Sequence, residues 1–181
     1  SHVWGAPNRM NKNGYRKLAK MNLLGPNHNL VHGVYLGASE LKLIVDSGAS
    51  ITVTPEVELQ MSHGIPLTGR LRELGFQPSI GVDVESNISG DMFTIMRIAM
   101  QTQRNLDNQC IAQKTKMPAQ KLSIKPKEAL EWATIESAKA LRLDKKVGSL
   151  KPGKQADLIL INKNDLNLFP VNDAVEAVVF H

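Results

Sequence analysis

The chain has 181 residues, which suits one domain but falls short of the about 250 residues of a complete eightfold βα barrel. Its residues are 42% apolar and 22% charged, a composition that favours a buried core and excludes a disordered or collagen-like protein. The formal net charge is +5, yet the basic residues do not gather with aromatic ones, so we expect no nucleic-acid partner.

Three successive stretches share one pattern: an amphipathic segment, a glycine, a few residues and a short β-branched run. They are KLAKMNLLGPNHNLVHG, SELKLIVDSGASITVTPE and TGRLRELGFQPSIGVD. Gly25, Gly48 and Gly75 stand where a helix ends in a left-handed residue, a conformation that glycine adopts without a steric penalty. The apolar runs that follow are residues 30–31, 51–53 and 79–82. Their lack of strict alternation predicts parallel strands covered on both faces, and helices alternating with them predict an α/β fold.

Beyond the third run the pattern changes. Asp91 provides an N-cap signal, and apolar residues at helical spacing predict a helix after it. Residues 103–125 are polar and interrupted by prolines, so we expect an irregular connection there. An apolar stripe predicts a helix over 127–143. The turn-rich segment and β-branched runs after residue 147, including AVEAVVF at 174–180, predict a small antiparallel β element.

Polar side chains follow the predicted strands. His32 ends the first, Thr54 and Glu56 follow the second, and Asp83 follows the third. In parallel sheets and barrels, ligands gather at the carboxyl ends of the strands. A histidine and an aspartate brought there from different strands are either metal ligands or an acid–base pair.

Four segments resemble the metal-dependent amidohydrolase superfamily, in particular its cytosine deaminase and atrazine chlorohydrolase-like branch. They are the opening His2-Val3-Trp4, LVHGVYLGASELKLIVDSGASITVTPE, HGIPLTGRLRELGFQPSIGVDVESN and ALEWATIESAKALRLDKKVGSLKPGKQADLILI. The resemblance implies the C-terminal part of a (β/α)8 TIM-type barrel over residues 1–146, from about strand four to the last helix. It implies part of a small β-sandwich domain over residues 147–181. In this numbering His2 ends strand four, His32 ends strand five and Asp83 ends strand eight.

The resemblance also implies a metal-dependent hydrolase that acts on a C–N bond of a cyclic amidine or heteroaromatic substrate, such as a purine, pyrimidine or triazine. One divalent metal ion, zinc or alternatively iron, would be bound by His32 and Asp83. Asp83 would also be the catalytic residue, accepting a proton from the activated water and passing it to the leaving group. The residues implied for substrate binding are His2, Glu56, His63 and Asn87.

Departures from the family pattern bear on this chemistry. The family carries a His-x-His pair at the end of strand one, and no such pair occurs in the sequence. Tyr35 stands where many members have a glutamate, and Val53 stands where a histidine is usual. Those two groups normally move protons and orient the substrate. Glu56, Glu58 and His63 lie nearby in the sequence as candidate replacements.

The leading hypothesis is thus that the chain is part of a metal-dependent hydrolase. The alternative is that it is a noncatalytic remnant or interaction module of the same fold. A doubly wound nucleotide-binding domain is disfavoured because no glycine-rich phosphate loop links a strand to a helix. We expect a small-molecule substrate and a homodimer, with neither a nucleic acid nor a membrane as partner. No apolar run reaches the about 18 residues of a membrane span, and Cys110 is the single cysteine, which favours a reducing, cytoplasmic location. The length suggests truncation, so we expect exposed apolar edges that a missing half would cover.

Overall fold

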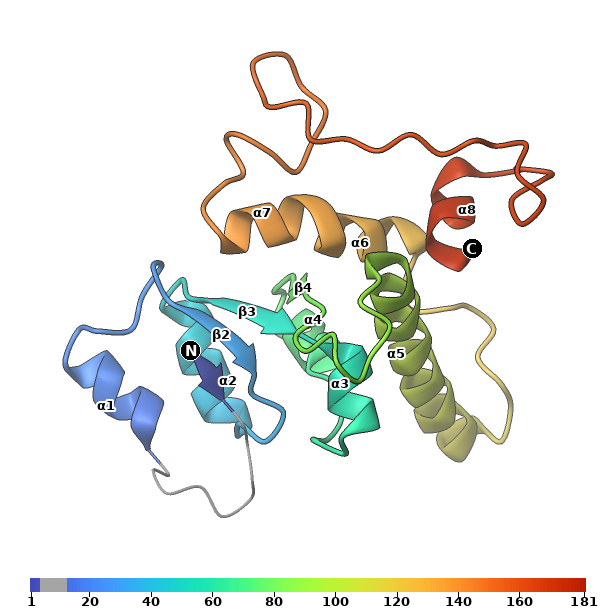
Figure 1. Cartoon of the computed structure of the whole chain (residues 1–181). Helices are drawn as coiled ribbons and strands as arrows, with labels where there is room; N and C mark the ends of the chain where they lie inside the picture. The colour runs from blue at the N-terminus through green and yellow to red at the C-terminus, as the bar shows by residue number, and fades with distance from the viewer. Residues whose placement is uncertain (4–12) are drawn as a thin grey trace.

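The computed structural model describes residues 1–3 and 13–181, and Figure 1 shows their arrangement. The strands are β1 (His2–Val3), β2 (Asn29–His32), β3 (Ser50–Val53) and β4 (Ser79–Ile80). The helices are α1 (Gly14–Lys20), α2 (Ala38–Asp46), α3 (Pro55–Gln60), α4 (Thr68–Glu73), α5 (Met92–Thr115), α6 (Pro126–Glu131), the π-helical turn η1 (Trp132–Glu136), α7 (Ser137–Ala140) and α8 (Ala174–Phe180). Each predicted strand has a counterpart in β2, β3 or β4, and β4 is shorter than predicted.

The strands form one parallel sheet in the order β1-β2-β3-β4. In register, Val3 lies beside His32, and Val53 lies beside Ile80. Parallel neighbours require crossover connections, which the intervening helical segments provide. The order follows the chain without the reversal that marks a doubly wound sheet, so it is the order of neighbouring strands in a barrel. The α/β class with a parallel sheet is therefore confirmed.

The number of strands corrects the count implied by the family resemblance. That count gave β2 and β3 as strands five and six and the strand of Asp83 as strand eight, which requires one more strand between Val53 and Ser79. The residues between them are all described, and they contain only α3, α4 and irregular segments. If Asp83 follows strand eight, then β2 is strand six and β1 is strand five.

Two apolar clusters hold the sheet to its helices. The first packs the interior of β2 and β3 against α1, α2 and α4, and its fully buried side chains include Leu30 and Ile51. The second packs Ile80 of β4 against α5, η1 and α8. At its centre, the indole Nε1 of the fully buried Trp132 donates to Gln77 Oε1 at 2.7 Å. This large ring is therefore buried without the loss of its hydrogen bond.

Helix α5 replaces the irregular connection that we expected from residue 103 onward. It runs to Thr115, because neither proline nor glycine interrupts it before Pro118. Its start is as predicted: the carboxylate of Asp91 accepts two backbone N–H groups of the first turn, each at 3.0 Å. Neither α5 nor any other helix of the described residues is long and apolar enough to cross a membrane.

The C-terminal part also differs from the expectation. The helix predicted over 127–143 is present as the continuous run α6, η1 and α7. No antiparallel β element is formed among the described residues: residues 147–173 contain no strand, and AVEAVVF, predicted as a β run, forms α8. Asp173 caps α8 by accepting from the N–H of Glu176 at 2.8 Å, and the fully buried Val179 packs into the second cluster. Helix capping and tertiary packing thus outweigh the β propensity of the valines.

The segment between α7 and α8 runs beyond α6 and α7, on the side away from the sheet (Figure 1). It contains consecutive exposed apolar side chains: Leu158 51%, Ile159 69%, Leu160 92% and Ile161 43%. A β-branched run is stable as a strand only when it pairs with others, and it has no pairing partner among the described residues.

Two of the three glycine predictions are confirmed. Gly48 and Gly75 follow α2 and α4 with φ of 80° and 70°. Helix α1 ends earlier than predicted, at Lys20, and Asn22 with φ of 55° adopts the left-handed conformation expected of Gly25. Asparagine tolerates this conformation because its side chain can hydrogen-bond locally.

Candidate functional site

His32 and Asp83 lie together at the carboxyl ends of the strands, as the sequence predicts. His32 is the last residue of β2, and Asp83 stands in the loop after β4. The His32 Nε2 atom lies 3.5 Å from Asp83 Oδ2. Both residues have left-handed backbones, with φ of 69° and 73°. Residues other than glycine adopt this conformation rarely, and such strain clusters at functional sites.

His2 joins this pair from the neighbouring strand β1. Its ring lies edge-on to that of His32, with the centroids 5.3 Å apart. Each of His2, His32 and Asp83 offers one ligand atom, and these atoms all lie within 4.8 Å of one another. His32 is 5% exposed and the Asp83 side chain 13%, whereas His2 is exposed. The cluster is therefore buried around His32 and open to solvent around His2.

The other ring nitrogen of His32 faces buried polar groups. Nδ1 lies 2.8 Å from Thr54 Oγ1 and 3.2 Å from Glu58 Oε1. Thr54 is the residue after β3, and Glu58 lies one turn further on in α3, so the i, i+4 spacing brings both side chains to one face. Thr54 is 1% exposed and Glu58 is fully buried.

The donor set fits a divalent metal ion. Two imidazoles and a carboxylate are ligand types of catalytic zinc sites, which use three protein ligands and keep one position for water. Nε2 of His32 faces Asp83, which leaves Nδ1 for the buried contacts that orient the ring. His2, His32 and Asp83 are thus the residues of this chain that could hold a metal.

The contacts of His32 show which of the other candidate site residues lie beside its ring. His63 reaches the ring, with centroids 5.7 Å apart and an interplanar angle of 86°. Val53 is fully buried in the first cluster, so its side chain cannot contribute to this site. Tyr35 is 42% exposed at the start of the loop after β2. His63 is therefore a candidate that lies directly beside His32.

Glu56 and Asn87, two residues predicted to bind substrate, join α3 to the loop after β4. The carboxylate of Glu56 accepts from the N–H of Ser89 at 3.1 Å and from its hydroxyl at 2.7 Å. Gln60 Nε2 donates to the backbone oxygen of Asn87. These contacts hold the loop that carries Asp83.

Glu58 is the site residue that the sequence did not select. It appeared only among several candidate replacements, because charged residues after a strand are most often solvated. The available signal was the spacing of Thr54 and Glu58 across the helix start at Pro55, which makes a turn of helix that faces the strand end.

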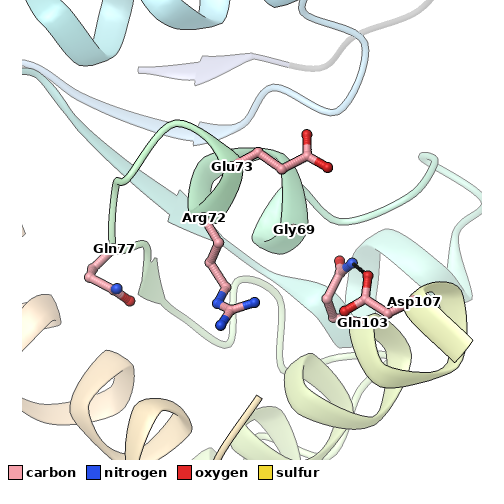
Figure 2. A pocket seen from close by; sticks show the side chains of 6 residues that line it. All are labelled: Gly69, Arg72, Glu73, Gln77, Gln103 and Asp107. Atoms are coloured by element: carbon pink, nitrogen blue, oxygen red, sulfur yellow. Dashed lines mark hydrogen bonds between the residues drawn. The ribbon is translucent and has the colours of Figure 1, made fainter. Parts of the chain in front are cut away.

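A separate hollow of about 310 Å³ lies between α4 and α5 (Figure 2). Its lining residues are Gly69, Arg72, Glu73, Gln77, Gln103 and Asp107. Gln103 Nε2 donates to Asp107 Oδ1 at 2.7 Å, and Arg72 pairs with Glu128 at 2.9 Å. It contains no histidine and none of the predicted site residues, so the strand-end cluster is the better candidate.

Comparison with known proteins finds deaminases among the sequence relatives. The sequence profile of the amidohydrolase family matches residues 10–180. A 5-methylthioadenosine/S-adenosylhomocysteine deaminase of Teredinibacter turnerae is 35% identical over 170 residues, which cover 93% of this chain and 36% of the relative. An 8-oxoguanine deaminase of Pseudomonas aeruginosa is 32% identical over 158 residues, covering 86% of this chain and 32% of the relative. The chain thus spans about a third of the length of these curated relatives.

Solved structures agree. An adenosine deaminase from Xanthomonas campestris with bound zinc is 25% identical, covers 91% of this chain and 35% of its own, and superposes with a TM-score of 0.77. A triazine hydrolase variant covers 99% of this chain and 39% of its own with a TM-score of 0.81, and at 20% identity it shows the fold alone.

Proposed function

Because this chain belongs to the amidohydrolase family, we propose that it forms part of the active site of a metal-dependent hydrolase. The reaction would be hydrolysis of a C–N bond in a cyclic amidine or heteroaromatic substrate, with release of ammonia. The observation that carries the proposal is the convergence of the ligand atoms of His2, His32 and Asp83 within 4.8 Å. The names of the relatives, which are deaminases of purine compounds, support a purine or a related heterocycle as the small-molecule substrate.

In this proposal His2, His32 and Asp83 hold one metal ion, zinc or alternatively iron. Such an ion lowers the pKa of a water molecule enough to make hydroxide available near neutral pH. Asp83 accepts the proton of the attacking water and passes it to the leaving nitrogen. His2 therefore changes from the predicted substrate contact to a metal ligand, and His63 stays as a substrate contact beside His32. Glu56 and Asn87 stay proposed substrate contacts, and they also hold the loop of Asp83.

The activity is proposed for the complete gene product. A catalytic zinc site needs its ligands and an enclosed cavity, and the family's His-x-His pair does not occur in this sequence. The four strands described here supply one arc of a barrel that would be closed by other strands. We propose that residues 1–146 belong to this barrel and that residues 147–181 join a β-sandwich with segments outside this sequence.

The wider setting follows from the same proposal. Cys110 is exposed and free, which supports a reducing, cytoplasmic compartment. We also propose a homodimer that acts without nucleic acid or membrane. The mass of the complete gene product in light scattering tests the dimer, and a monomer mass would contradict it.

The decisive experiment is metal analysis of the complete gene product together with ammonia release from a panel of purines, pyrimidines and triazines. His32→Ala and Asp83→Asn should lose bound metal and lower kcat/KM by about 10²–10⁴-fold. Asp46→Asn is the matched control, because Asp46 forms an exposed ion pair with Lys42 on α2. Full metal occupancy and activity in both site variants would reject the assignment. A parent protein without metal or activity would instead favour the noncatalytic module.

A further inference from the structure

Glu58 places a carboxylate in a fully buried position directly behind His32. Its Oε1 atom lies 3.2 Å from the backbone nitrogen of Thr54, 3.2 Å from the Thr54 hydroxyl and 3.2 Å from His32 Nδ1. Its Oε2 atom is buried and has no hydrogen-bond partner among the described residues. Burying a carboxylate with an unpaired oxygen is costly, so a gain in stability is a poor explanation for this residue.

The hydrogen bonds around Oε1 decide which nitrogen of His32 carries the proton. The N–H and the hydroxyl of Thr54 both donate to Oε1, so Oε1 is an acceptor. The same hydroxyl has then used its proton and can only accept from His32 Nδ1, which lies 2.8 Å away. Both neighbours of Nδ1 are therefore acceptors, so Nδ1 carries a proton.

We propose that Glu58 is the positioning residue of His32, acting with Thr54 to keep the proton on Nδ1. This inference rests on the proposed function, in which Nε2 of His32 binds the metal through its lone pair. The contact between Glu58 and Nδ1 keeps the Nε2 lone pair directed toward Asp83, whose Oδ2 atom lies 3.5 Å from Nε2. The carboxylate of Glu58 also makes the imidazole a stronger electron-pair donor to a metal. Glu58 approaches His32 from α3, the helix that follows the neighbouring strand β3.

A simpler role for Glu58 would be to cap α3. Its carboxylate accepts from the N–H of Thr54, the N-cap residue, which resembles the reciprocal contacts of a capping box. Loss of a cap lowers stability but leaves the tautomer of His32 and the metal affinity unchanged. The two roles therefore differ in what a substitution of Glu58 does to His32.

The test uses the complete gene product and two substitutions of different kind. Glu58→Gln keeps an acceptor at Oε1 and removes the charge, so it should weaken zinc affinity by about 10-fold. Glu58→Leu removes the acceptor, which frees the Thr54 hydroxyl to donate to Nδ1, and it should weaken zinc affinity by up to about 100-fold. Competition with a chelator measures the affinity. Glu128→Gln is the matched control, because Glu128 pairs with Arg72 and lies outside the cluster, and its affinity should stay within about twofold.

The tautomer of His32 in the metal-free protein is the second readout. Nitrogen-15 chemical shifts, assigned with a His32→Asn variant, should show the proton on Nδ1 in the parent and on Nε2 in Glu58→Leu. If the parent binds no zinc while this tautomer change occurs, the proposed function fails and the positioning role stands. Unchanged zinc affinity and an unchanged tautomer in folded Glu58→Leu would overturn the inference.

Should that variant not fold, Thr54→Val and Thr54→Ser replace it. Only the valine variant, which lacks the hydroxyl, should weaken zinc binding, and equal affinities in the two would overturn the inference.

Discussion

Thr54 and Thr68 are both buried, but their hydroxyl groups differ in hydrogen bonding. The hydroxyl of Thr54 bridges His32 and Glu58. Thr68, at the start of α4, is 1% exposed, and its hydroxyl has no hydrogen-bond partner among the described residues. A buried hydroxyl without a partner costs about 1–3 kcal/mol, so the two hydroxyls have opposite effects on folding.

We therefore expect Thr68→Val to leave the free energy of unfolding unchanged or to raise it by up to about 1 kcal/mol. Thr54→Val should lower it by about 1–3 kcal/mol, because Nδ1 of His32 and Oε1 of Glu58 both lose a partner. Urea denaturation of the complete gene product measures both values. A larger loss for Thr68→Val than for Thr54→Val would contradict this account of the two hydroxyls.

The site was predictable where a residue lies at the end of a strand. His32 and Asp83 follow short apolar runs, and parallel strands bring such ends to one edge of the sheet. Glu58 was not predictable as a partner of His32, since their contact depends on how α3 turns back over β2 and β3. The substrate roles given to Glu56 and Asn87 stay predictions, and the contacts of both residues with the loop after β4 were not predictable from local sequence.

At the scale of elements, α5 depends on its N-cap. The hydrogen bond from the Thr94 hydroxyl is the main cause that holds the pKa of Asp91 below its ordinary value of 3.8, and the N–H groups of Phe93 and Thr94 add to it against the effect of burial. A carboxyl group whose pKa is lower in the folded state stabilises the fold above its unfolded pKa. That contribution disappears as the pH falls through the folded pKa.

Asp91→Ala should therefore lower the free energy of unfolding by about 1 kcal/mol at pH 7. The difference between the parent and the variant should shrink as the pH falls below 4, because protonated Asp91 loses its advantage as an acceptor. Asp91→Asn keeps an acceptor and is the matched control. Urea denaturation at several pH values measures the effect, and a difference that does not change with pH would contradict it.

Local signals predicted some elements and not others. The β-branched runs and Gly48 predicted β2, β3 and the end of α2, because strand and cap signals act within a few residues. The same reasoning took AVEAVVF for a strand, since valine favours strands. The helix forms because Asp173 caps it and Val179 finds a buried place against the second cluster, and that place is created by residues eighty positions earlier in α5.

The molecule as a whole leaves an apolar run uncovered. Leu160 is 92% exposed and lies in a run of four consecutive exposed apolar residues, 158–161. If residues 147–181 join a β-sandwich in the complete gene product, this run is buried there. The proposed domain division therefore predicts that a charge at this position is harmful.

Leu160→Asp should lower the free energy of unfolding of the complete gene product by about 2–5 kcal/mol, as charges placed in apolar interfaces do. Met117→Asp is the control, since Met117 is also exposed and lies in the turn after α5. Its effect should stay within about 0.5 kcal/mol. Equal effects of the two substitutions would remove the support for a sandwich that includes this run.

Helix α3 connects to both sides of the proposed metal site. Glu58 contacts His32, while Glu56 and Gln60 hold the loop of Asp83 through Ser89 and Asn87, respectively. The positions of the two proposed ligands, His32 and Asp83, therefore both depend on this six-residue helix. Substitutions on the two faces of α3 should then be non-additive, since either one loosens the same short helix. A local opening of α3 would release both ligands in one cooperative step, so metal loss and helix opening should have the same midpoint on heating.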